Sequence, residues 1–227
     1  MIKIEEIKQL IKDGKIACCQ TDVVAVGEIV SDDDLIHEYK LHHGWDIAKC
    51  QVCDTEWGKF NFALMEFINQ TYKGAELAKV LESIQMDDGH WDWFKKAYLK
   101  TGEEYNWFFF CVDEIPQAAC LIFHPKKSAL HDGKIFYIEY VAVAPWNRVN
   151  PMVSRKFKGI ASIVIRYAIN YAKNTLNLAY GFSLHSLPKA EEYYEKIGMT
   201  RQAHLDDGQL PYFEMNVARA ISFLEDA

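Results

Sequence analysis

Positively charged and small side chains stand together at residues 155–161, in a pattern that suits the binding of an anion. The cations are Arg155, Lys156 and Lys158, in a chain of formal net charge −7. Gly159 and Ala161 keep bulky side chains away from the neighbouring main-chain N–H groups. The apolar residues from Ile160 to Tyr171 recur at helical spacing, so a helix is predicted to begin here. Because the first N–H groups of a helix lack partners and carry partial positive charge, this segment is predicted to bind a phosphate or diphosphate.

The alternative is a helix whose basic first turn is simply solvated. Positive side chains at a helix N-terminus oppose the helix dipole, so an isolated helix would favour Asp or Glu at residues 155–158. A bound anion would remove this conflict, which favours the anion site over the alternative.

Two strand and helix pairs in succession are predicted to position this segment. Ile135–Val143 is a run of apolar, aromatic and β-branched residues that predicts a strand buried on both faces, ended by Pro145. Residues 178–185 alternate in polarity or size, which predicts a second strand. Ser186 is then predicted to cap a short helix, with Gly198 in the left-handed conformation after it. A strand, helix, strand succession makes a right-handed crossover between parallel strands, with the ligand crevice at their carboxyl ends.

The segment from Lys156 to Ala161, after the predicted strand, resembles the fingerprint of the GNAT superfamily of N-acetyltransferases. That fingerprint is Gln or Arg, two variable residues, Gly, one variable residue, and then Gly or Ala. Lys156 stands where the family has Gln or Arg, which keeps the charge and loses the planar guanidinium. The resemblance covers residues 103–216 and points to a functionally unassigned bacterial branch of the family.

The resemblance implies an α/β fold of the α+β type. Its central sheet would be mixed and mostly antiparallel, flanked by helices, with two splayed parallel strands at its centre. The implied activity is the transfer of an acetyl or other acyl group from acetyl-CoA to a primary amine, by direct attack in a ternary complex. The sequence does not name the amine, which is a small molecule or a peptide. A non-catalytic CoA-binding sensor or interaction module of the same fold is the alternative.

The resemblance also assigns the residues that would hold acetyl-CoA. Main-chain groups of the strand would hold pantetheine and the thioester oxygen, at Val141, Ala142 and Val143. The diphosphate segment would consist of Arg155, Lys156, Phe157, Lys158, Gly159, Ile160 and Ala161. Ser186 would serve either as the helix cap or as a pantetheine contact.

Tyr194 occupies the position of the family's usual proton donor to the departing thiolate of CoA. The family pattern is Tyr, a variable residue, Lys or Arg, a variable residue, Gly and an apolar residue, and residues 194–199 fit it. Ala190, Tyr193, Tyr194 and Ile197 also recur at helical spacing, so the alternative is that both tyrosines only face the core. Tyr193 is the second candidate for the same role.

Removal of a proton from the amine requires a base, for which the chain offers two candidates. Glu139 lies in the middle of the predicted central strand, on the same face as Tyr137 and Val141, where a carboxylate would be desolvated. Its alternative is a structural role, paired with a cation or exposed at a bulge. His185 stands at the end of the second strand, where the crevice opens, and its alternative is a hydrogen-bonding role. Glu214, on a later strand, could orient the amine.

The size of the chain predicts one domain over residues 1–227. With 227 residues and 50% hydrophobic content, it can bury one substantial core. Residues 103–216 would form the acyl-CoA-binding core, and residues 1–100 an elaborated N-terminal region of helices and strands. In that region, residues 32–34 are three consecutive aspartates that are expected to cap a helix.

The acidic charge balance argues against a nucleic acid or an anionic membrane as a partner. No apolar run is long enough to cross a bilayer, and residues 1–6 begin an amphipathic helix rather than a secretory signal. A cytoplasmic protein is therefore predicted, and a homodimer is left open.

Cysteine and histidine residues at positions 42–53 present a metal-binding alternative. His42, His43, Cys50 and Cys53 are potential ligands of a structural zinc ion in a zinc-stabilised interaction protein. Their spacing is shorter than that of typical zinc fingers, and the other cysteines lie in apolar surroundings. Reduced thiols of a cytoplasmic protein and no metal are therefore the expectation.

Overall fold

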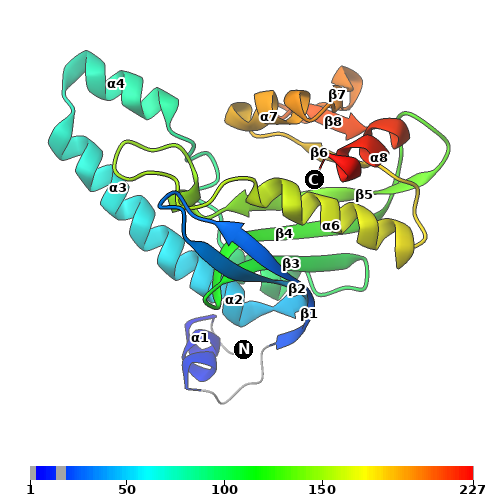
Figure 1. Ribbon diagram of the computed structural model, residues 1–227, viewed down its shortest axis with the longest axis horizontal. Coiled ribbons are helices and arrows are strands. Elements are labelled where there is room, and N and C mark those ends of the chain that lie inside the picture. The colour runs from blue at the N-terminus through cyan, green and yellow to red at the C-terminus, as the bar shows by residue number, and fades with distance from the viewer. Residues whose placement is uncertain (1–3, 14–18, 227) are drawn as a thin grey trace.

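The computed structural model describes residues 4–13 and 19–226. Its strands form one eight-stranded sheet in the order β1-β2-β3-β4-β5-β6-β8-β7 (Figure 1). The strands are β1 Cys19–Val30, β2 Ile36–Asp46, β3 Tyr105–Val112, β4 Ile115–Lys127, β5 Lys134–Val143, β6 Phe182–His185, β7 Thr200–Arg201 and β8 Tyr212–Met215. Among these strands, β5 and β6 are the parallel pair and all other neighbours are antiparallel. The predicted fold class, a mixed and mostly antiparallel sheet with a parallel central pair, is confirmed.

Side-chain alternation along β3 shows that helices cover both faces of the sheet. Phe108 and Phe110 are fully buried in one cluster with residues of α6 and α8. Trp107 and Phe109 point to the opposite face and pack with residues of α2 and α5. The helices of the first face are α6 Ile160–Asn174 and α8 Val217–Glu225, and those of the second are α2 Ile47–Val52 and α5 Trp93–Leu99. The two faces are called the α6 face and the α5 face below.

The remaining helices lie at the edges of the sheet. A π-helical turn, Cys53–Trp57, leads from α2 into α3 Gly58–Thr71, and α4 Gly74–Ser83 folds back on it. These two helices form the cyan arm that projects from the sheet in Figure 1. The other two helices are α1 Ile4–Lys12 and α7 Glu191–Lys196. Within the described residues, no helix is both long and apolar enough to cross a bilayer.

The parallel strands separate soon after they pair. Residues 136–138 of β5 pair with residues 182–184 of β6, and no pair follows in the register. β5 continues along β4 to Val143, whereas β6 ends at His185. The register of β4 with β5 shifts between Ile138 and Tyr140, so Glu139 is an extra residue, a β-bulge, at the point of separation. A gap therefore opens between the strands beyond Ile138.

Three local expectations were wrong. The second strand begins at Phe182 rather than at residue 178, because Gly181 has a φ of 115° that interrupts the extended chain. Ser186 does not cap a helix, since its Oγ donates to the Leu187 carbonyl and a 3-10 turn at Pro188–Ala190 precedes α7. The expected left-handed conformation of Gly198, with φ 85°, is confirmed.

The third wrong expectation concerns the three aspartates at residues 32–34. They lie in the turn of the β1–β2 hairpin rather than at a helix start. There Ser31 Oγ donates to Asp33, and the Asp32 N–H donates to the Lys156 carbonyl at 3.0 Å. The tertiary pairing of β1 with β2 leaves no helix for these residues to cap.

Candidate functional site

The N-terminus of α6 is open and carries no side-chain cap. Gly159 is its N-cap residue, with a φ of 79° that favours glycine, and no side chain of the described residues caps the helix start. A Cβ atom added at Gly159 would meet no atom within 4 Å. The N–H groups of residues 160–162 belong to the first helical turn and have no partner within the helix. The predicted start of a helix at this segment is confirmed, and there is space in front of it.

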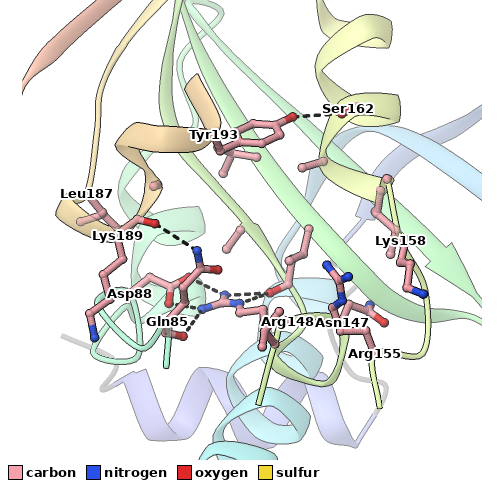
Figure 2. Close-up of a pocket in the computed structure, with 18 of the residues that line it drawn as sticks. Gln85, Asp88, Asn147, Arg148, Arg155, Lys158, Ser162, Leu187, Lys189 and Tyr193 are labelled. Carbon is pink, nitrogen blue, oxygen red and sulfur yellow. Dashed lines mark hydrogen bonds and ion pairs between the residues drawn. The ribbon is translucent and has the colours of Figure 1, made fainter. Parts of the chain in front are cut away.

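A cavity of about 560 Å³ lies in front of this helix start and extends along the end of β5 to α7. We call it the α6 cavity. Figure 2 shows side chains from four separate segments around it, with Ser162 and Tyr193 at one end and Asp88 and Arg148 at the other. The predicted cofactor residues among its walls are Val141, Ala142, Val143, Arg155, Phe157, Lys158, Gly159, Ile160 and Ala161.

The cations of the predicted anion segment are placed differently from one another. Arg155 lines the α6 cavity and forms no ion pair with a carboxylate of the described residues. Lys158 also lines it, and its Nζ lies 3.4 Å from an exposed carboxylate oxygen of Asp32. Lys156 lies outside the cavity wall, with its Nζ 5.2 Å from the centre of the Phe157 ring. Of the three cations in this segment, Arg155 and Lys158 thus line the cavity.

The end of β5 presents main-chain groups to the gap beside β6. The Ala144 N–H donates to the Gln117 carbonyl of β4 at 2.8 Å, so this residue faces β4. Successive residues of a strand direct their N–H groups to opposite edges, so Val141 and Val143 direct theirs away from β4. β6 has ended on that side, and both residues line the α6 cavity. These N–H groups can donate to a ligand in the gap.

Arg148 closes one end of the α6 cavity, which no pattern in the sequence indicates. Its Nε and one terminal nitrogen donate to the Val143 carbonyl at 3.0 and 2.7 Å. The two terminal nitrogens also donate to the carboxylate of Asp88, both at 2.6 Å, and one donates to the Gln85 carbonyl (Figure 2). Arg148 and Asp88 are 60 positions apart, so no local pattern could reveal the pair.

Tyr193 and Tyr194 both line the α6 cavity, in different surroundings. The Tyr193 hydroxyl lies 3.0 Å from Ser162 Oγ, in the first turn of α6 (Figure 2). Tyr194 is only 7% exposed, and burial raises its pKa well above the usual value of a tyrosine. Its hydroxyl is therefore protonated at neutral pH and can act as a proton donor.

The expectation that Glu139 is an unpaired, desolvated carboxylate was wrong. The Glu139 side chain is 23% exposed, and one of its oxygens lies 3.6 Å from Lys100 Nζ. The bulge interrupts the alternation of side chains between the two faces of the sheet, and Glu139 does not line the α6 cavity. The structural alternative, a cation partner at a bulge, describes what is observed.

His185 forms a hydrogen-bonded pair with Tyr137 where β5 and β6 separate. The Tyr137 hydroxyl lies 2.7 Å from His185 Nδ1, and His185 Nε2 lies 2.9 Å from the Leu205 carbonyl oxygen. A carbonyl can only accept, so Nε2 carries the proton, and the Nδ1 of the neutral ring accepts from Tyr137. Burial raises the pKa of Tyr137 to about 12, so its hydroxyl keeps its proton at neutral pH.

Glu214 and Ser186 are buried and hold main-chain segments in place. Glu214 is 1% exposed and accepts hydrogen bonds from Ser128 Oγ and, at 2.9 Å, from the Ala129 N–H. Ser186, also 1% exposed, does not line the α6 cavity. Neither side chain is placed to contact a ligand in that cavity.

The four potential zinc ligands do not come together. Cys50 and Cys53 are fully buried in the cluster on the α5 face, whereas His43 lies 2.8 Å from Asn106 and its ring packs at a tilt against Tyr171 of α6. In the part of the chain that the structure describes, no three His, Cys, Asp or Glu side chains are grouped to hold a metal ion.

No protein-family model matches this chain, and no curated protein matches it. Solved structures do resemble it. An uncharacterized protein from Bacillus halodurans is 9% identical with a TM-score of 0.48, over 90% of this chain and 99% of that one. The GNAT domain of S. lividans PAT is 11% identical with a TM-score of 0.47, over 84% and 96%. Mycobacterium smegmatis RimJ, in complex with CoA-disulfide, is 10% identical with a TM-score of 0.46, over 91% and 94%. The second of these three is a GNAT domain.

One of these neighbours is thus a domain of the family that residues 103–216 resemble in sequence. At identities of 9–11% and TM-scores below 0.5, the likeness carries no argument about activity or substrate. Any assignment of function to this chain depends on its own site.

Proposed function

We propose that the protein is an acyl-CoA-dependent N-acyltransferase that transfers an acetyl or other acyl group to an amine. The observation that supports this is the α6 cavity, which joins an uncapped helix N-terminus to the free main-chain edge of β5 and to a buried tyrosine. The diphosphate, the amide-containing arm and the departing thiolate follow one another along a CoA thioester. They would be bound, in that order, by the helix N-terminus, the strand edge and the tyrosine.

The residues present fit a CoA thioester. The N–H groups of residues 160–162, with Arg155 and Lys158, would hold the diphosphate, and the open space at Gly159 admits its oxygens. The N–H groups of Val141 and Val143 would hold pantetheine and the thioester oxygen. When bound, the thioester supplies an acyl carbon that an amine can attack.

The reaction would require two proton transfers. The amine loses a proton as its nitrogen forms the new bond to the acyl carbon and the C–S bond breaks. Tyr137 would accept that proton at its oxygen while it passes its own proton to His185 Nδ1, and the Leu205 carbonyl holds the ring in this orientation. Tyr194 would donate a proton to the thiolate, since burial keeps its hydroxyl protonated. We assign the base to His185 rather than to Glu139, because Glu139 is paired with Lys100.

The test is calorimetric titration with acetyl-CoA, followed by a thiol-release assay over amines of graded size and charge. Saturable binding and thiol release with a subset of amines are expected. Binding without release for every amine would instead favour the non-catalytic CoA-binding module. Absence of binding would refute both functions.

A further inference from the structure

A second cavity, of about 660 Å³, lies on the α5 face of the sheet, and of its wall the reaction proposed above uses His185 and the Leu205 carbonyl. It is bounded by the loop at residues 126–132, the segment at residues 204–205, and the side chains of His185 and Tyr212. We call it the loop cavity. We infer that it binds an anionic group of the acyl acceptor, so that the acceptor is a small amine that also carries a carboxylate or a phosphate. This inference rests on the proposed function.

The chain at the end of β6 contributes to the walls of both cavities. His185 lines the loop cavity, and Leu187, two residues later, lines the α6 cavity. Neighbouring residues of a strand face opposite sides of the sheet. Because Leu184 packs in the cluster on the α6 face, His185 faces the α5 side. A thioester that enters the gap from the α6 side would therefore meet an acceptor bound on the α5 side, beside Tyr137 and His185.

The loop cavity is positively charged in an acidic protein. Lys126 and Lys127 line it, together with His131, His185 and His204. Asp132 is the one carboxylate among its described lining residues. No carboxylate among the residues that the structure describes forms an ion pair with Lys126 or Lys127, whereas Lys40, Lys49 and Lys100 each have one. Two unpaired lysines at the wall of a cavity favour an anionic ligand.

One of these lysines lies beside the proton-accepting pair. Lys126 Nζ is 5.4 Å from the centre of the Tyr137 ring, and the Tyr137 hydroxyl contacts His185. An acceptor whose anionic group pairs with Lys126 would consequently place its amine within reach of the same tyrosine. This arrangement selects for molecules with an amine and an anion a short chain apart.

A buried carboxylate holds the cationic loop without neutralising it. Glu214 accepts from Ser128 Oγ and from the N–H groups of Ala129 and Leu130, at 2.9 and 3.3 Å for the two N–H groups. Ser128 Oγ in turn accepts from the His131 N–H at 3.1 Å. The negative charge of Glu214 is thus engaged by the loop main chain, and the two lysines remain available to a ligand.

The test compares acceptors of matched length in the thiol-release assay with acetyl-CoA. Aminovalerate, pentylamine and cadaverine share a five-carbon chain and end in a carboxylate, a methyl group and a second amine, and phosphoethanolamine is compared with ethanolamine. The expected kcat/KM is at least about tenfold higher for the anionic member of each set. The double variant Lys126→Gln/Lys127→Gln should remove this preference by raising the KM of the anionic acceptors. The variant Lys79→Gln, on exposed α4, should behave as wild type.

Equal or better use of pentylamine or cadaverine would overturn the inference and leave the proposed function intact. If no amine releases thiol, calorimetric titration with phosphoethanolamine decides whether the loop cavity binds an anionic amine. The inference is supported without catalysis if Lys126→Gln/Lys127→Gln weakens this binding at least about tenfold and Lys79→Gln does not. No binding of phosphoethanolamine, or binding that both variants leave unchanged, refutes it. Failure of the proposed function is recognised separately, by the absence of acetyl-CoA binding.

Discussion

Two adjacent tyrosines at the α6 cavity have different partners, and this difference separates their roles. Tyr193 is hydrogen-bonded to Ser162 in the first turn of α6, where we place the diphosphate. Tyr194 lies deeper, and its hydroxyl has no hydrogen bond within the part of the chain that the structure describes. A free, protonated hydroxyl is suited to donate a proton to a leaving group, and Tyr193 is suited to hold the helix start.

Replacement of Tyr194 by Phe should lower kcat about 100-fold, because the thiolate would then leave without a proton donor. The KM for acetyl-CoA should change less than about twofold, since the ring that fills the core remains. Both kcat and the KM for acetyl-CoA are measured by thiol release at saturating amine. Tyr193→Phe is the matched control and should affect acetyl-CoA affinity more than kcat. An unchanged kcat in Tyr194→Phe would remove this residue from the mechanism.

His42 predicts a pH dependence of stability. It is 6% exposed, and its Nε2 has no hydrogen-bond partner within the described residues. Burial, followed by the charge of Lys49, lowers its pKa below the ordinary value of 6.5. The unfolded chain then binds the proton more readily, so the stability due to neutral His42 is present above pH 6.5 and lost as pH falls below it.

In urea unfolding between pH 7.5 and pH 5, the free energy of unfolding of the wild type should therefore fall more steeply than that of His42→Phe. Each unit by which the pKa is lowered corresponds to about 1.4 kcal/mol. His90→Gln, at an exposed histidine, should keep the wild-type slope. Parallel curves for the wild type and His42→Phe would contradict this account.

At the scale of elements, the start of α6 combines a left-handed glycine with open space. Gly159→Ala should raise the Kd for CoA about tenfold, because a Cβ atom would occupy the space that the diphosphate needs. The backbone strain at a positive φ costs about 1 kcal/mol for any L-residue. Gly74 shares a positive φ and open surroundings but starts α4, so Gly74→Ala should lose similar stability and keep the affinity. Equal Kd values for the two variants would mean that the start of α6 does not bind CoA.

At the scale of the whole molecule, a strap at residues 83–88 connects the helical arm to the α6 cavity. Arg148 ties this strap to the end of β5, and the Lys189 ammonium donates to the Ile84 carbonyl at 2.7 Å. Gln85 donates to the Lys189 carbonyl at 3.0 Å (Figure 2). These bonds hold three segments far apart in the sequence around one cavity.

Arg148→Met should lower the free energy of unfolding by about 3 kcal/mol, because Asp88 would remain largely buried without its partner. Amide hydrogen exchange in residues 83–88 should become faster at the same time. The double variant Arg148→Met/Asp88→Asn should recover part of the loss, since no charge then lacks a partner. Unfolding curves of Arg148→Met that match the wild type would show that the pair does not stabilise the strap.

The sequence was sufficient where structure depends on local patterns. The strand at β5, the helix α6 and the glycine turns at Gly159 and Gly198 follow from β-branched runs, helical spacing and glycine chemistry. The order of these elements, with their resemblance to a known family, was enough to predict a mixed sheet with a parallel central pair.

Features that depend on long-range pairing could not be predicted. The bulge at Glu139 arises from the register of β5 on β4, and the turn at residues 32–34 arises from the pairing of β1 with β2. The Arg148–Asp88 pair and the Tyr137–His185 pair join residues 60 and 48 positions apart. Single residue types at such separations leave no periodic or motif signal, so only the fold brings them together.

The most direct test of the central claim compares the binding of CoA with that of pantetheine, which lacks the diphosphate. Calorimetric titration of the wild-type protein should give a Kd for CoA at least about 100-fold lower than that for pantetheine, because the start of α6 and its cations would contact the diphosphate. Similar affinities for the two compounds, or no binding of CoA, would contradict the account.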